Sequence, residues 1–284
     1  MKKVILCPNA TRDTELKNTL KVRDILSARD IETVICPLFE SEELPLPQEY
    51  TYSDIEKEMA DTDMVVTFGG DGTILRAARI VSEKHIPILA VNMGTMGFMA
   101  ELETDELDQI FRVLDGDYEI ERRMMLDVTL TRGEETVCTG FALNDVVIGN
   151  MAHTIDLEIY GDEHAITNYS GDGVIMATPT GSTAYSMSAG GPVAEPSAKN
   201  IIVTPICAHV LVAKSFVLAP DRVITAVLGT RRDYPAYLAI DGNSVPLYGG
   251  DIVTVRRSAR ETWLIQLSNK SFYKKVHEKL GERT

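Results

Sequence analysis

The chain of 284 residues carries a net charge of −14, and 44% of its residues are hydrophobic and 25% charged. This balance is typical of a globular protein with one large or two medium domains. No apolar run reaches the roughly 18 residues of a membrane span, and the acidic surface argues against non-specific nucleic-acid binding. Four widely spaced cysteines favour free thiols in a reducing cytoplasm over a disulfide framework or a zinc site.

Strand-like and helix-like segments alternate through residues 1–118. Strand patterns occur at 4–7, 31–36, 64–68 and 86–91, and helical patterns at 11–27, 52–60, 74–83 and 105–114. This alternation predicts a Rossmann-like parallel sheet with helices on both faces. Ligands of such sheets bind at the carboxyl ends of the strands.

The pattern changes after residue 118, because strand-like runs dominate residues 119–266. They occur at 125–131, 136–148, 155–160, 174–177, 201–205, 222–228, 236–240, 252–257 and 263–266. We therefore expect a mostly antiparallel, β-sandwich-like second domain. Residues 267–284 contain a helical pattern at 272–280, and we expect this helix to pack back on the first domain.

The segment Gly69-Gly70-Asp71-Gly72-Thr73 lies between a strand pattern and a helix pattern that runs from Ile74. Its glycines allow the backbone to approach a ligand closely, and the N-terminus of the following helix favours phosphate. A carboxylate in such a loop repels phosphate, so we expect Asp71 to accept a proton from a hydroxyl or to hold a metal during phosphoryl transfer. The alternative is a tight turn with Asp71 as the helix N-cap.

Two further polar segments stand out in the second half. Asn144 and Asp145 interrupt the apolar run 136–148, and adjacent polar residues there are costly unless they are paired. They could bind ribose hydroxyls or an adenine edge, or form a bulge or a strand end. Gly171-Asp172-Gly173 is a flexible turn with a carboxylate, or simply a hairpin turn.

The segment 178–192 is rich in hydroxyls and small residues. Its hydroxyls and N–H groups could bind phosphate or ribose, and the Tyr185 ring could stack on a base, although such a segment is often only a loop. Asp241-Gly242-Asn243 forms a third acidic turn.

The order of these segments resembles bacterial NAD kinases over about Met64 to Val255. The shared segments are Gly-Gly-Asp-Gly-Thr at 69–73, Asn-x-Gly-x-x-Gly-Phe at 92–98, Asn-Asp at 144–145, Gly-Asp-Gly at 171–173, Thr-Pro-Thr-Gly-Ser-Thr-Ala-Tyr-Ser at 178–186 and Asp-Gly-Asn at 241–243. The resemblance implies an active site between two domains and a homodimer or homotetramer. It implies transfer of the γ-phosphoryl group of ATP, with Mg or Mn and no prosthetic group, to the 2′-hydroxyl of the adenosine ribose of NAD.

The resemblance also implies residue roles. Asp71 matches the proton acceptor, Gly72 lets the substrate approach, and Arg76 is a phosphate partner or a solvated helix charge. The other implied substrate-binding positions are Asn144, Asp145, His153, Ser170, Asp172, Thr183, Ala184, Tyr185, Ser186, Ser188 and Asn243. Ser170 stands where some members carry Arg, so a cation that would pair with pyrophosphate is missing. We assign no metal-ligating side chain.

Other classes of protein remain open. Lipid kinases and phosphofructokinases also use Gly-Gly-Asp-Gly loops, but they do not explain the block at 178–188. A non-catalytic dinucleotide sensor need not keep Asp71. No Gly-x-x-x-x-Gly-Lys-Ser/Thr segment is present, so an ATP site would not be of the P-loop kind. We expect NAD and ATP, or polyphosphate, as partners, and no nucleic acid or membrane.

Overall fold

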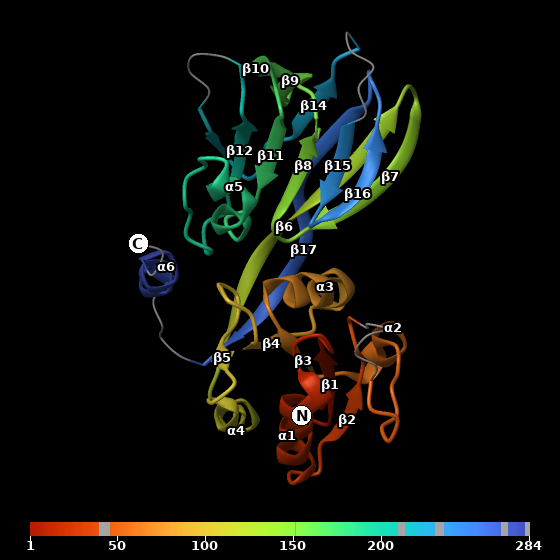
Figure 1. Cartoon of the computed structure of the whole chain (residues 1–284), viewed down its shortest axis with the longest axis vertical. Coiled ribbons are helices and arrows are strands. Elements are labelled where there is room, and N and C mark those ends of the chain that lie inside the picture. Colours follow the sequence, from red (N-terminus) through yellow and green to blue (C-terminus); the bar gives the residue numbers. More distant parts are fainter. Residues whose placement is uncertain (40–45, 151, 210–213, 231–235, 268–271, 282–284) are drawn as a thin grey trace. The chain divides into compact units, whose positions relative to one another are not determined.

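The computed structural model describes residues 1–39, 46–150, 152–209, 214–230, 236–267 and 272–281. The chain divides into two compact units, unit 1 (1–122 and 261–284) and unit 2 (123–260) (Figure 1). The chain passes from one unit to the other within two long strands, β6 (Glu119–Arg132) and β17 (Ile252–Gln266). The divisions therefore fall a few residues from the boundaries expected at 118 and 266, because a strand pattern does not show where a continuous strand changes unit.

Unit 1 contains a parallel sheet in the order β17-β4-β3-β1-β2, and β5 pairs with β4. Its strands, apart from β17, are β1 (Lys3–Pro8), β2 (Glu32–Ile35), β3 (Met64–Gly69), β4 (Ile88–Asn92) and β5 (Leu102–Glu103). Every residue of β3 and β4 is buried. This burial on both faces explains why the central strands read as continuous apolar runs in the sequence.

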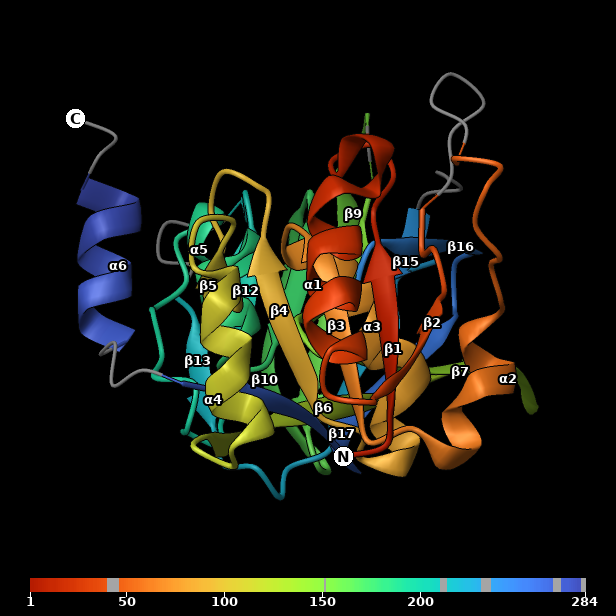
Figure 2. The ribbon, with the colours of Figure 1, turned by 90° about the horizontal axis from the view of Figure 1, so that it is seen from below.

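Helices cover both faces of the unit 1 sheet. Unit 1 contains the helices α1 (Lys17–Ser27), α2 (Ile55–Glu58), α3 (Asp71–Val81), α4 (Ile110–Leu114) and α6 (Phe272–Gly281), with short 3-10 turns at 14–16, 59–61, 82–84 and 107–109, and of these α1, α3 and α4 lie on the sheet. Apolar side chains of α1 and α4 pack with Leu6, Val66 and Val91 in one cluster. Figure 2 shows α1 and α4 in front of these strands and α3 behind them.

The first helix begins later than the expected residue 11. The buried Asp13 carboxylate accepts hydrogen bonds from the backbone N–H groups of Asn18 and Thr19, at 3.0 and 2.9 Å, and so caps a helix that starts at Lys17. Glu15, with φ of 55°, is left-handed and interrupts the helical pattern before it.

Unit 2 consists of two sheets. One contains β10 (His164–Gly171), β9 (Ile155–Gly161), β14 (Ile224–Leu228), β17, β6 and β7 (Glu135–Ala142). The other has the order β13 (Phe216–Leu218), β12 (Ile201–Ile206), β11 (Gly173–Ala177), β8 (Asp145–Gly149), β15 (Ala236–Ile240) and β16 (Asn243–Leu247). All neighbours in this second sheet are antiparallel.

The two sheets of unit 2 share one apolar core. It includes Leu157 and Ala226 from the first sheet, and Ile148, Met176 and Leu238 from the second. The core lies between sheet faces, as in a β-sandwich. The expected classes, α/β followed by a mostly antiparallel β-sandwich-like domain, are confirmed.

Several expected boundaries in unit 2 were wrong. The run 136–148 is two strands, β7 and β8, separated by a bend at Leu143–Asn144, so Asn144 is not inside a strand. The runs 252–257 and 263–266 form one strand, β17, and the strands β10, β13 and β16 were not predicted. Gly171-Asp172-Gly173 is not a hairpin turn, because it joins β10 of one sheet to β11 of the other.

The four cysteines are free, and Cys7 and Cys36 are buried. Among the described residues, no helix combines the length and the apolar character that a membrane crossing requires.

Candidate active site

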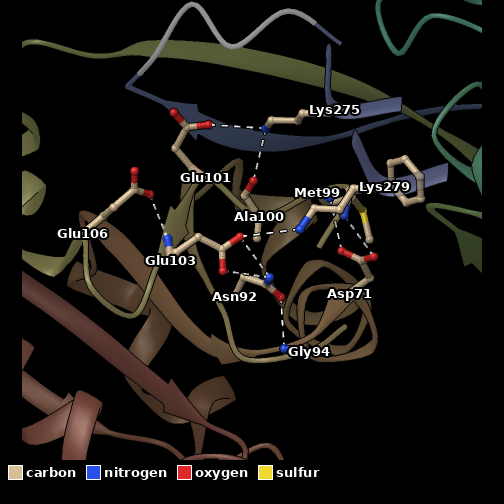
Figure 3. A network of polar contacts seen from close by, with 11 residues as sticks. Asp71, Asn92, Gly94, Met99, Ala100, Glu101, Glu103, Glu106, Lys275 and Lys279 are labelled. Atoms are coloured by element: carbon tan, nitrogen blue, oxygen red, sulfur yellow. Dashed lines mark hydrogen bonds and ion pairs between the residues drawn. The ribbon is translucent and has the colours of Figure 1, made fainter. Parts of the chain in front are cut away.

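The loop at 69–73 connects β3 directly to α3. The helix begins at Asp71, three residues earlier than the pattern from Ile74 suggested, and Gly70 occupies the N-cap position that we had considered for Asp71. The carboxylate of Asp71 therefore lies in the first helical turn. Its two oxygens accept hydrogen bonds from the backbone N–H groups of Met99, at 3.1 Å, and Phe98, at 3.2 Å. Figure 3 shows how these bonds tie Asp71 to the chain that follows β4.

The second glycine turn, at 92–98, is held by Asn92. The Asn92 side chain accepts a hydrogen bond from Gly94 N–H at 3.0 Å and donates to the Glu103 carboxylate at 3.0 and 3.1 Å (Figure 3). Gly97 has φ of +60°, and a Cβ there would lie 2.6 Å from Asn92 Cγ. A side chain at 97 would thus displace Asn92, so this glycine keeps the turn in a shape that presents two N–H groups to Asp71.

Gly72 and Arg76 lie on α3 next to Asp71. A Cβ built on Gly72 would meet no atom within 4 Å. Packing of the chain therefore does not require glycine at this position. The exposed Arg76 stacks on Phe39, with its guanidinium carbon 4.7 Å from the ring centroid. This contact fits the reading of Arg76 as a helix-surface charge better than that of a phosphate partner.

The C-terminal helix α6 contacts the segment that follows the second glycine turn. Lys275 Nζ donates to the Ala100 carbonyl at 3.1 Å and lies 3.6 Å from the buried Glu101 carboxylate. Lys279 lies 3.7 Å from the Glu103 carboxylate, which also binds Asn92 (Figure 3). A chain of polar contacts thus runs from α6 through Glu103 and Asn92 to the turn.

In unit 2, Asn144 and Asp145 lie where β8 begins, and they are held by a carboxylate from the β15–β16 turn. Asp241 accepts hydrogen bonds from the N–H groups of Leu143, Asn144 and Asp145 at 2.7, 2.9 and 3.1 Å. On the other side, Thr178 N–H donates to the Asn144 carbonyl at 2.9 Å. The sequence placed Asp241 in an acidic turn but gave no sign of this contact.

The backbone N–H groups of Asn144 and Asp145 are hydrogen-bonded, but the oxygens of their side chains are not bonded by the described residues. Asp145 is 8% exposed, and no hydrogen-bond donor among the described residues reaches its carboxylate. Burial, and then the negative charge of Asp241, raise the Asp145 pKa to about 7. The buried Oδ1 atom of Asn144 accepts no hydrogen bond from the described residues. The Asp145 carboxylate can therefore accept hydrogen bonds from a ligand, whereas the Asn144 oxygen is closed off from solvent in this conformation.

Most hydroxyls of the block 178–188 bond within the chain. Ser186 is fully buried and lies 3.0 Å from the Thr204 hydroxyl, and Thr183 donates to the Thr180 carbonyl at 3.2 Å. Ser182 donates to the Pro179 carbonyl at 2.6 Å. These hydroxyls hold the shape of the loop. The sequence pattern did not distinguish them from hydroxyls that face a ligand.

Tyr185 is the large exposed side chain of this block, at 44%. Partial burial raises the pKa of its phenol first, and Tyr237, Cys207, Asp172 and Asp145 raise it further. These electrostatic effects indicate that Asp145 and Asp172 lie in the surroundings of Tyr185. Ala184 is half-buried and Ser188 is exposed on either side of the ring position.

Three further candidates make their contacts elsewhere in unit 2. The Ser170 hydroxyl donates to the Asp156 carboxylate. His153 is exposed, and its backbone N–H donates to the Asn150 side chain at 2.8 Å. Asn243 is exposed, and its amide donates to the Ile240 carbonyl at 3.3 Å.

No group of three or more His, Cys, Asp or Glu side chains within the described ranges is arranged to hold a metal ion. Magnesium bound with a nucleotide usually takes only one or two protein carboxylates, together with phosphate oxygens and water. The half-buried carboxylate of Asp71 in a loop suited to phosphate fits that kind of site.

A parallel sheet with a glycine-rich strand–helix loop and a carboxylate in the first turn of the helix is the arrangement of a phosphate-binding enzyme site that is not of the P-loop kind. Residues 6–118 match the model of the ATP-NAD kinase N-terminal domain, and residues 143–267 match that of the C-terminal domain. The chain belongs to the ATP-NAD kinase family.

Relatives cover the whole chain. It is 35% identical to the NAD kinase of Acetivibrio thermocellus, over 100% of this chain and 98% of that protein, and 38% identical to that of Natranaerobius thermophilus, over 99% and 98%. Among solved structures, yeast NADH kinase in complex with NADH has a TM-score of 0.87 and 26% identity, over 100% of this chain and 89% of that chain. The NAD kinase of Archaeoglobus fulgidus in complex with ATP has a TM-score of 0.75 and 25% identity, over the full length of both chains.

Proposed function

We propose that this chain is an NAD kinase, which transfers the γ-phosphoryl group of ATP to the 2′-hydroxyl of the adenosine ribose of NAD and releases NADP and ADP. Membership of the ATP-NAD kinase family and the curated NAD kinase relatives support this reaction. The observation that carries the chemistry is Asp71, a carboxylate fixed at the N-terminus of α3 by two backbone N–H groups.

Asp71 acts as the general base. A ribose hydroxyl is a weak nucleophile, and a positioned carboxylate that takes its proton lets the oxygen attack phosphorus. Each carboxylate oxygen of Asp71 accepts one hydrogen bond from the chain, so each keeps acceptor capacity for a substrate hydroxyl. The empty space beside Gly72 leaves room for a substrate to approach.

The phosphoryl donor binds with a divalent metal, Mg or Mn. When bound, such a metal neutralises the negative charge that the transferring phosphoryl group carries. The chain itself supplies backbone N–H groups at the start of α3, whose partial positive charge favours phosphate oxygens.

Asn144, Asp145, Asp172 and Tyr185 bind NAD. The Asp145 carboxylate accepts hydrogen bonds from ribose hydroxyls or from the adenine amino group, and the Asn144 amide joins it after a side-chain rotation that brings its buried oxygen to the ligand. The exposed ring of Tyr185 stacks on a ring of the dinucleotide. Ser186 supports this loop from beneath, because its hydroxyl is buried against Thr204.

The proposal extends to biological context. The reaction supplies NADP, and the free cysteines fit a reducing cytoplasm. The resemblance to bacterial NAD kinases supports a homodimer or a homotetramer, which the mass in solution would distinguish.

Incubation of the purified chain with NAD, ATP and MgCl₂ tests the reaction, with NADP followed by a coupled dehydrogenase and ADP measured in parallel. We expect NADP and ADP to form in equal amounts. ADP formation without NADP, or phosphorylation of diacylglycerol, sphingosine or a sugar phosphate in place of NAD, would overturn the proposal. Arms with NADH and with polyphosphate define acceptor and donor range, and the NADH arm is motivated by the similarity to yeast NADH kinase.

A further inference from the structure

Asp241 occupies a turn whose geometry directs its carboxylate at the backbone of another strand. Asp241 and Gly242 have φ of 44° and 83° and connect β15 to β16 between the paired residues Ile240 and Asn243. Two successive left-handed residues form the tight hairpin turn that matches strand twist. Aspartate tolerates this conformation better than most side chains.

The Asp241 carboxylate takes up three consecutive N–H groups. Oδ2 accepts from Leu143, and Oδ1 accepts from both Asn144 and Asp145, all within 3.1 Å. Asp241 N–H returns a hydrogen bond to the Asp145 carbonyl at 3.1 Å. Four hydrogen bonds thus fix the backbone at the point where β7 ends and β8 begins. Asn144 and Asp145, whose side-chain oxygens accept no hydrogen bond from the described residues, lie at this point.

We propose that Asp241 is a positioning residue, which orients Asn144 and Asp145 for NAD through their backbone and tunes Asp145 through its negative charge. This inference rests on the proposed function, in which Asn144 and Asp145 bind NAD. Asp241 itself need not touch the ligand, because its oxygens are engaged by the chain.

The charge effect follows from the groups that face Asp145. Asp241 faces it from the β15–β16 turn, and Tyr185 faces it from the helix at 185–188. Arg123, on β6, donates to the hydroxyl of Thr180 in the loop before this helix at 3.2 Å. A second carboxylate close to a buried one disfavours ionisation of both, which contributes to the raised pKa of Asp145.

This arrangement makes NAD binding dependent on pH. Asp145 accepts hydrogen bonds from NAD best as a carboxylate, because protonation turns one of its oxygens into a donor and removes its charge as the pH falls through its pKa of about 7. Removal of the charge at 241 lowers the pKa of Asp145 and moves this loss of affinity to lower pH. A turn residue with a purely structural role would weaken binding without moving the pH dependence.

The test compares NAD binding by isothermal titration across about pH 5 to 9 in the parent chain, Asp241→Asn and Asp241→Gly. Both replacements tolerate the left-handed backbone, and circular dichroism checks that both variants fold. Asp162→Asn is the matched control, because Asp162 also has a positive φ, of 55°, and its carboxylate accepts Val223 N–H at 3.0 Å in another turn of unit 2.

At high pH, where Asp145 is ionised in all variants, we expect roughly tenfold weaker binding in Asp241→Asn, because the amide cannot accept from all three N–H groups. Asp241→Gly should bind more weakly still. In both, the acidic loss of affinity should have a lower midpoint than in the parent, and Asp162→Asn should match the parent.

Unchanged affinity in both Asp241 variants, or weaker binding with the midpoint unmoved, would overturn the inference. Asp145→Asn separates this failure from failure of the proposed function. If Asp145→Asn binds NAD as the parent does, the assignment of Asp145 to NAD is wrong and the inference falls with it. If Asp145→Asn binds poorly while both Asp241 variants bind normally, only the inference fails.

Discussion

Asp71 in unit 1 and Asp145 in unit 2 are each the first residue of a regular element, but the hydrogen bonding of their carboxylates differs. Asp71 starts α3, and both of its oxygens accept backbone N–H groups. Asp145 starts β8, and the N–H groups around it are taken by Asp241 instead. A group that removes a proton benefits from a fixed position before the substrate arrives. A group that recognises a ligand can remain unsatisfied until the ligand supplies the donors.

The largest effect that tests this contrast is on turnover. Asp71→Asn keeps the size of the side chain but removes the proton acceptor, so kcat should fall by roughly 10²–10⁴, while the Kd for NAD changes little. Steady-state kinetics of NADP formation and titration of NAD binding measure the two quantities. In Asp145→Asn we expect the larger change in the Kd for NAD and the smaller change in kcat.

The two variants control for each other, since both exchange a carboxylate for an amide. Equal turnover in Asp71→Asn and the parent would remove Asp71 from the chemistry. A loss of NAD affinity in Asp71→Asn as large as that in Asp145→Asn would remove the distinction between the two groups.

The second effect is on stability, because Asp145 is a buried carboxylate that no donor of the described residues reaches. Its pKa in the folded protein, about 7, lies above the ordinary value of 3.8, so the folded state binds the proton more tightly than the unfolded state. The contribution of Asp145 to stability therefore falls as the pH rises from about 4 to about 7, at up to roughly 1.4 kcal/mol per unit, and this loss is complete above that window.

We expect Asp145→Asn to be more stable than the parent at pH above about 8, by on the order of 2 kcal/mol, and to lose this advantage by about pH 4. Urea unfolding at both pH values measures it. A variant that is less stable than the parent at high pH would show that Asp145 is satisfied by groups other than those described.

How much of this site the sequence predicted depends on how far apart along the chain the interacting residues lie. β3, the glycine loop and α3 follow one another directly, and their pattern was sufficient to predict the strand and the helix, although the helix starts at Asp71 and not at Ile74. The break between β7 and β8 was predicted only as an alternative, a bulge or a strand end, because the Asp241 carboxylate that holds it lies 97 positions from Asn144. Ser186 was assigned to the ligand because a hydroxyl that bonds to Thr204 cannot be told from a free one by residue type.

The third effect concerns the turn that supports Asp71. Asn92→Ala removes the hydrogen bonds to Gly94 and Glu103, which hold the turn whose N–H groups face Asp71. Since Asn92 is buried, we expect a loss of about 1–3 kcal/mol in unfolding free energy. We also expect a fall of roughly tenfold in kcat, because misplacement of a catalytic group slows the reaction.

Asn18→Ala provides a comparison in the same unit, because the Asn18 amide donates to a carboxylate, Asp13, away from the loop. It should lower stability without a change in kcat at temperatures where it remains folded. If Asn92→Ala lost stability alone and kept its kcat, the turn would not contribute to the position of Asp71.

The smallest effects come from α6, where two lysines contact the same segment in different surroundings. Lys275 and its partner Glu101 have side chains 16% and 1% exposed, whereas Lys279 and Glu103 are 26% and 48% exposed. A charge contact shielded from water is screened less by salt. Lys275→Ala should therefore cost about 1–3 kcal/mol, and Lys279→Ala less than about 1 kcal/mol. At high salt the effect of Lys279→Ala should vanish and that of Lys275→Ala should persist. Glu103 also binds Asn92, which links Lys279 to the catalytic loop. If kcat changed more in Lys279→Ala than in Lys275→Ala, the surface contact, and not the buried one, would couple the position of α6 to that loop.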